Sequence, residues 1–205
     1  MILFEKDFQE KGAIVDLQTS NKWFIRMAQH LKLMGIRNNK FMLSLYDREL
    51  QGRDPHNLKD SSQELRLRVA QECKHNYWYF TREVVRIPQS GENEPGHYVL
   101  NRANLALAWS YLNCFDPFLT MPRQIGKTYA AIVITAWIFY IAGIRVTLGL
   151  FARGNYLVQD NVDRLKTVRD GLPGIGTRQQ PRGGGCGSGA GAVAVAERLQ
   201  ALGDP

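Results

Sequence analysis

The chain has 205 residues, of which 44% are hydrophobic and 22% charged, and this is enough for one domain of about 170 residues and a tail. Residues 1–173 hold 23 Lys and Arg against 17 Asp and Glu. This surplus of basic residues is spread along the chain and not clustered, so it supports nucleic-acid binding only weakly. Three widely separated cysteines and four scattered histidines exclude a disulfide framework and a zinc pattern, and they are typical of a reducing cytoplasm.

Residues 1–96 have the pattern of a helical lead-in. Asn21–Met34 places apolar side chains at helical spacing between Lys and Arg. Ser61 and Glu64 predict a capping box that leads into a helix over Leu65–Cys73. Turn-rich breaks are expected at Gln51–Pro55 and Pro88–Gly96.

A run of aromatic residues stands at His75–Phe80. Two interpretations are open: a platform on which nucleic-acid bases stack between basic residues, or a part of the hydrophobic core. Aromatic side chains this dense on a helix are more often core.

The segment Met121–Thr128, Met-Pro-Arg-Gln-Ile-Gly-Lys-Thr, ends like a phosphate-binding loop. Gly126 is the small residue that lets successive backbone N–H groups turn toward phosphates. Lys127 can reach the terminal phosphates, and the Thr128 hydroxyl can ligate Mg²⁺ at the start of the next helix. Met121 stands where the full motif has a further glycine, so a chance Gly-Lys-Thr in a surface loop is the alternative.

The flanking sequence predicts the strand–loop–helix–strand unit that such a loop requires. Phe115–Thr120 can form a short strand, Thr128–Ala142 a buried helix that stops at Gly143, and Ile144–Ala152 a second strand. The expected fold class is therefore α/β: an incomplete parallel sheet of the P-loop NTPase kind, RecA-like (ASCE), with the helical lead-in before it.

A membrane helix is the rival explanation for the apolar run. Tyr129–Ile144 has no charge, but a span needs about 20 residues, and Arg145 ends the run too early. A polar loop directly before it has no place in lipid. Acidic charge within the first residues argues against a signal peptide, so no membrane association is expected.

The loop Pro122–Thr128, with Arg and Gln inside it, resembles the deviant Walker A motif of the large terminase subunit. This subunit is the DNA-packaging motor of tailed bacteriophages related to the T4 group. Tyr77–Pro88, Leu100–Leu107 and Asp160–Pro173 resemble segments of the same family's ATPase domain, in the expected order. The resemblance covers residues 70–173, and only the loop is specific by itself.

The resemblance implies a site for ATP and Mg²⁺. Lys127 would bind the β- and γ-phosphates, and Thr128 the metal. Arg123 would act in cis as the catalytic arginine on the γ-phosphate; its alternative role is a simple ion pair with a carboxylate. The implied loop residues are Pro122, Arg123, Gln124, Ile125, Gly126, Lys127 and Thr128.

Asn104 stands near the position of the family's adenine-reading Gln, on a helix expected from Asn101 to Asn113. An amide of either residue type can read the edge of a base. Asn is shorter by one methylene, however, and a simple exposed helix residue is the alternative.

No apolar strand ending in Asp-Glu follows Thr128, and the family's acidic nuclease cluster is also missing. Residues 97–173 are therefore expected to be a partial ATPase core that binds nucleotide without turning it over. The implied partners are double-stranded viral DNA, the portal protein and the small terminase subunit, in the host bacterial cytoplasm. The alternatives are a non-enzymatic remnant and another P-loop ATPase such as a helicase.

The composition changes at residues 174–205, which hold nine of the nineteen glycines. Such a segment can bury little and is expected to be flexible. A fused or frameshifted tail is favoured over a glycine-rich RNA-binding tail, because repeated Arg-Gly-Gly and aromatic residues are missing.

Overall fold

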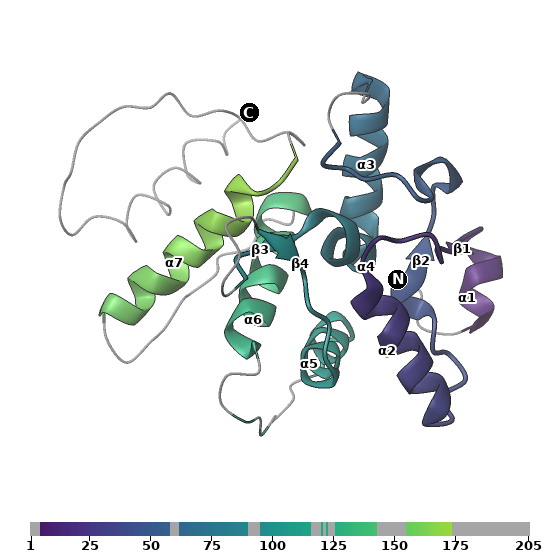
Figure 1. The fold of residues 1–205 in the computed structure, drawn as a ribbon, viewed down its shortest axis with the longest axis horizontal. Coiled ribbons are helices and arrows are strands. Elements are labelled where there is room, and N and C mark those ends of the chain that lie inside the picture. The colour runs from purple at the N-terminus through teal and green to yellow at the C-terminus, as the bar shows by residue number, and fades with distance from the viewer. Residues whose placement is uncertain are drawn as a thin grey trace.

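The computed structural model of the protein describes residues 5–57, 62–89, 95–115, 120, 122, 126–142 and 155–173 (Figure 1). The predicted tail, 174–205, and the predicted strand Ile144–Ala152 lie outside these ranges.

The first half of the chain combines short helices with one small antiparallel pair of strands. β1 pairs with β2 so that Ile14 lies opposite Leu45, and Val15 opposite Ser44. The elements are α1 (Glu5–Glu10), β1 (Ile14–Val15), α2 (Lys22–Leu33), the 3₁₀ turns η1 (Phe41–Leu43) and η2 (Arg48–Leu50), β2 (Ser44–Leu45) and α3 (Gln63–His75).

The second half contains the central aromatic turn and three further helices. A second antiparallel pair joins β3 to β4, with Arg86 opposite His97. Figure 1 shows α7 on the opposite side of this pair from α1 and α2, with α5 and α6 below the pair. The elements are α4 (Tyr77–Tyr79), the π-helical turn η4 (Phe80–Val84), β3 (Arg86–Ile87), β4 (Gly96–His97), α5 (Arg102–Leu112), α6 (Lys127–Ala136), the π-helical turn η5 (Trp137–Ile141) and α7 (Asn155–Asp170).

Within the described residues both sheets are antiparallel and two-stranded. The predicted strand Phe115–Thr120 is wrong at the two positions that can be compared, Phe115 and Thr120, since neither is in a strand. Its other residues, like those of the strand after α6, lie outside the described ranges. The parallel P-loop sheet therefore stays a prediction.

Side-chain caps start the helices where the sequence favours them. Asn21 caps α2 and Asn101 caps α5, each accepting a hydrogen bond from a backbone N–H of the first turn. The predicted helices Asn21–Met34 and Asn101–Asn113 are confirmed between these caps. The cap of α3 is Ser62, whose hydroxyl accepts from the N–H of Leu65; the predicted cap, Ser61, lies outside the described residues.

Two of these helices end in the same Schellman motif. After α2, Gly35 has φ of 78°, the N–H of Gly35 donates to the carbonyl of Lys32, and the N–H of Ile36 donates to that of Leu31. After α5, Cys114 takes the glycine position with φ of 56°. Phe115 then donates to the carbonyl of Ser110, and this turn keeps it out of a strand.

One hydrophobic core joins the lead-in to α6. The aromatic run predicted as core is confirmed, because Tyr77, Trp78, Tyr79 and Phe80 are all buried. Trp137, at the end of α6, packs edge-on against Tyr77 at 5.5 Å between ring centroids and donates its indole N–H to the carbonyl of Cys73 at 2.7 Å. η5 thus lies against α3, while α6 itself packs beside α5 and α7. In the described part of the chain no helix is both long and apolar enough to cross a membrane.

A buried arginine, Arg82, connects the residues next to β1 and β2 to the turn η4. The Arg82 side chain is 0% exposed, and its Nε donates to Glu83 at 2.7 Å while one Nη donates to the carbonyl of Met42 at 2.7 Å. The other Nη lies 3.5 Å from the Asp16 carboxylate. Burial raises the pKa of Asp16 above its usual range, although the charge of Arg82 opposes the shift. Asn21 adds bonds from its amide to the carbonyls of Arg82 and Tyr98.

Candidate functional site

The phosphate-loop glycine begins α6. Gly126 has φ of 83°, a left-handed conformation in which a Cβ atom is unfavourable, and its carbonyl accepts the first helical bond from Ala130 at 3.0 Å. No side chain caps this end of the helix in the described residues. Lys127 and Thr128, the first two helical residues, are both exposed. The predicted helix is confirmed across α6 and η5.

Asn104 of α5 faces this glycine. Its amide nitrogen lies 3.5 Å from the position of an ideal Cβ on Gly126. The residue is only 3% exposed, so the alternative of a simple exposed helix residue is wrong. Two predicted site residues, 22 positions apart in the sequence, are thus brought together where α5 packs beside α6.

The Asn104 amide has hydrogen-bonding capacity left over. Its backbone N–H is used by the cap residue Asn101, and its side-chain nitrogen makes one long bond of 3.4 Å to the carbonyl of Val99. The side-chain oxygen is buried and has no partner among the described residues. Leaving a buried acceptor unsatisfied costs about 1–3 kcal/mol, so a donor at this position is favoured.

A further cation approaches the start of α6 from α7. The guanidinium of Arg164 lies over the ring of Tyr129 at 5.5 Å from its centroid, next in sequence to Thr128. Arg164 also pairs with Asp160 at 2.7 Å. The resemblance of Asp160–Pro173 to the family segment is the one sequence signal for this neighbour, because the contact depends on how α7 folds back on α6.

The remaining loop residues are only partly described. Pro122 is exposed, while Arg123, Gln124 and Ile125 lie outside the described residues. For metal binding, no group of three or more His, Cys, Asp or Glu side chains gathers within the described ranges. The metal ligand predicted from the sequence is Thr128, and this residue is exposed and accessible to a hydrated cation.

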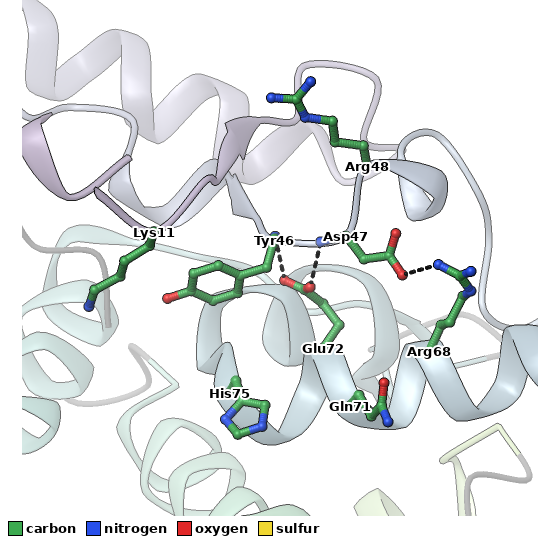
Figure 2. Close-up of a pocket in the computed structure, with 8 residues that line it drawn as sticks. All are labelled: Lys11, Tyr46, Asp47, Arg48, Arg68, Gln71, Glu72 and His75. Carbon is green, nitrogen blue, oxygen red and sulfur yellow. Dashed lines mark hydrogen bonds and ion pairs between the residues drawn. The ribbon is translucent and has the colours of Figure 1, made fainter. Parts of the chain in front are cut away.

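An open cavity of about 660 Å³ lies elsewhere, between α3 and the β2–η2 turn (Figure 2). Its central carboxylate, Glu72, accepts bonds at 3.0 Å from the N–H groups of Tyr46 and Asp47. The second carboxylate, on Asp47, pairs with Arg68 at 3.1 Å. Both acids therefore hold the turn against α3, and we assign these walls a structural role. The lining residues are Lys11, Tyr46, Asp47, Arg48, Arg68, Gln71, Glu72 and His75.

Comparison of the chain with protein-family models, with curated proteins and with solved structures found no match. The indications of function are therefore the residues at the start of α6 and the resemblance of their loop.

Proposed function

We propose that the chain is the ATP-binding part of a DNA-packaging motor of the large terminase subunit type. One observation carries the proposal: the buried amide of Asn104 meets Gly126 at the start of a helix whose first residues are Lys127 and Thr128. A glycine in a left-handed conformation, an exposed lysine and an exposed hydroxyl are the groups that a phosphate loop uses. The amide oxygen of Asn104, which has no partner among the described residues, can accept a hydrogen bond from a donor group on the ligand.

Each residue has a defined role in this proposal. Lys127 binds the β- and γ-phosphates as a point charge, and Thr128 ligates Mg²⁺ through its hydroxyl. Asn104 accepts a hydrogen bond from the adenine amino group. Arg123 acts on the γ-phosphate in cis. The metal, when bound, neutralises phosphate charge, and the partial positive charge of the α6 N-terminus acts in the same direction.

The wider setting follows the family. The motor would act on double-stranded viral DNA, together with a portal protein and a small terminase subunit, in the host bacterial cytoplasm. Turnover of ATP needs one carboxylate to hold Mg²⁺ and a second to position the attacking water. No such pair follows Thr128 at the end of an apolar strand-like run. We therefore propose nucleotide binding, without hydrolysis, for this 205-residue chain.

The test is titration of the purified chain with Mg-ATP and with Mg-GTP. Lys127→Ala should weaken both nucleotides about 10- to 100-fold, because it removes charge-assisted hydrogen bonds to phosphate. Asn104→Leu should abolish a preference for ATP over GTP, because GTP has a carbonyl where ATP has the amino group. Lys74→Ala, a lysine change on α3, is the control for charge. Equal ATP affinity in the chain and in Lys127→Ala would refute the phosphate site.

A further inference from the structure

A second cavity, of about 420 Å³, is lined by residues of α1 and β1 and by the C-terminal end of α2 with the turn that follows it. Its walls divide by chemistry. One wall is apolar and is formed by Phe8, Ala13 and Val15. The other wall is polar and carries three cations and two asparagine amides: Lys32, Arg37, Asn38, Asn39 and Lys40. Gln9 also lines the cavity. Among the described residues, no Asp or Glu lines this cavity.

The cations of this cavity have no neutralising partner in the described part of the chain. From residue 17 to residue 46 the sequence contains no acidic residue and five Lys or Arg. Lys32, Arg37 and Lys40 are exposed, and none of the three has an ion-pair partner among the described residues. Asp7 of α1 does not line the cavity; its charge contributes instead to the raised pKa of Tyr46.

The helix end reduces this positive charge only slightly. The C-terminus of α2 carries the equivalent of about half a negative charge, against three full positive charges. Its last carbonyls are already bonded, those of Leu31 and Lys32 to the N–H groups of Ile36 and Gly35. The Asn39 amide nitrogen also donates to the carbonyls of Ile36 and Arg37, which fixes the turn that carries Arg37.

We propose that this cavity binds a phosphate monoester with an apolar or aromatic body. A monoester carries close to two negative charges at neutral pH and three acceptor oxygens, which suits three cations that have no ion-pair partner among the described residues. A phosphodiester carries one charge and suits them less. The apolar wall at Phe8, Ala13 and Val15 gives the organic part a surface to cover. This proposal is independent of the nucleotide site at Gly126.

The experiment uses the full chain carrying Lys127→Ala, so that the phosphate loop does not contribute. Phenyl phosphate, inorganic phosphate and phenyl methyl phosphate are titrated and followed by calorimetry and by amide chemical shifts. Phenyl phosphate should bind more tightly than either of the others. Equal or tighter binding of the diester would indicate a nucleic-acid backbone instead and would overturn the proposal.

Two variants assign the two walls. Lys32→Gln with Arg37→Gln should weaken phenyl phosphate about tenfold or more, as expected for the loss of two charge-assisted contacts. Phe8→Ala should remove the advantage of phenyl phosphate over inorganic phosphate, while retained phosphate binding shows that the variant is folded.

The matched control is Lys22→Gln with Arg26→Gln. It removes the same charge from the first half of α2, away from the cavity, and should leave the affinity within about twofold. An equal loss of affinity for phenyl phosphate in the control would show that the effect comes from the overall charge of α2 and not from the cavity. That result, or the absence of binding, would overturn the proposal.

Discussion

The amide nitrogen of Asn104 lies 3.5 Å from the place where a side chain on Gly126 would begin. This is an ordinary van der Waals separation, so a methyl group at Gly126 would fit beside Asn104. The requirement for glycine comes from the backbone instead, because φ of 83° is unfavourable for other residues. Substitutions at Gly126 can therefore distinguish the effect of side-chain contact with Asn104 from the effect of backbone conformation.

We expect Gly126→Ala to lower the free energy of unfolding by about 1–2 kcal/mol, the cost of a left-handed conformation with a Cβ atom. Gly126→Asn should cost less, since Asn tolerates this conformation. Urea unfolding followed by circular dichroism measures both. If the two substitutions had the same cost, side-chain contact with Asn104 rather than backbone conformation would decide the stability.

The Schellman motif after α5 predicts a stabilising substitution. Cys114 occupies the left-handed position that Gly35 occupies after α2. Cys114→Gly should raise the free energy of unfolding by about 1 kcal/mol, and Gly35→Ala should lower it by a similar amount. Cys114→Ser controls for loss of the thiol. Urea unfolding of all three variants tests this, and a destabilised Cys114→Gly would contradict it.

Local signals account for what the sequence could predict of this fold. Helix caps and apolar spacing lie within a few residues of each other, so α2 and α5 were predicted at both ends. α3 was predicted one residue too early at its cap, because Ser61 and Ser62 are adjacent and only the folded turn selects Ser62. β1 and β2 have two residues each, too short for an alternating pattern to be visible.

Contacts between distant segments could not be predicted. Gly126, Lys127 and Thr128 were found from their motif, but the burial of Asn104 depends on the packing of α5 beside α6. Arg164 reaches Tyr129 only because α7 folds back. The ligand chemistry of single residues is thus readable from the sequence, whereas their neighbours are set by tertiary packing.

The buried ion cluster of Arg82 predicts a large loss of stability when the arginine is removed. Arg82→Met leaves Asp16 and Glu83 buried without their cation, which costs about 3–5 kcal/mol. Arg68 is the control, because it also pairs with carboxylates, three instead of two, but at the surface. Arg68→Met should have a clearly smaller effect in the same urea titration. Similar losses in both variants would show that burial is not the cause.

Two half-buried histidines predict a pH dependence of stability. His56, whose ring nitrogen lies 2.8 Å from the carbonyl of Val84, and His97 both have their pKa lowered, first by burial and then by the charge of Arg86. The folded protein therefore binds fewer protons than the unfolded chain near pH 6. Their contribution is fully present above the unfolded pKa of about 6.5 and is lost as the pH falls through the lowered folded values.

We therefore expect the free energy of unfolding to fall between pH 7.5 and pH 5.5, by at most about 1.4 kcal/mol per pH unit for each histidine. In the double variant His56→Gln with His97→Gln the slope should be smaller, because neither residue can then take up a proton on unfolding. Subtracting the two curves removes the contributions of carboxylates such as Asp16, and His30→Asn on the exposed face of α2 controls for loss of a histidine. A double variant as steep as the parent protein would place the pH dependence in other groups.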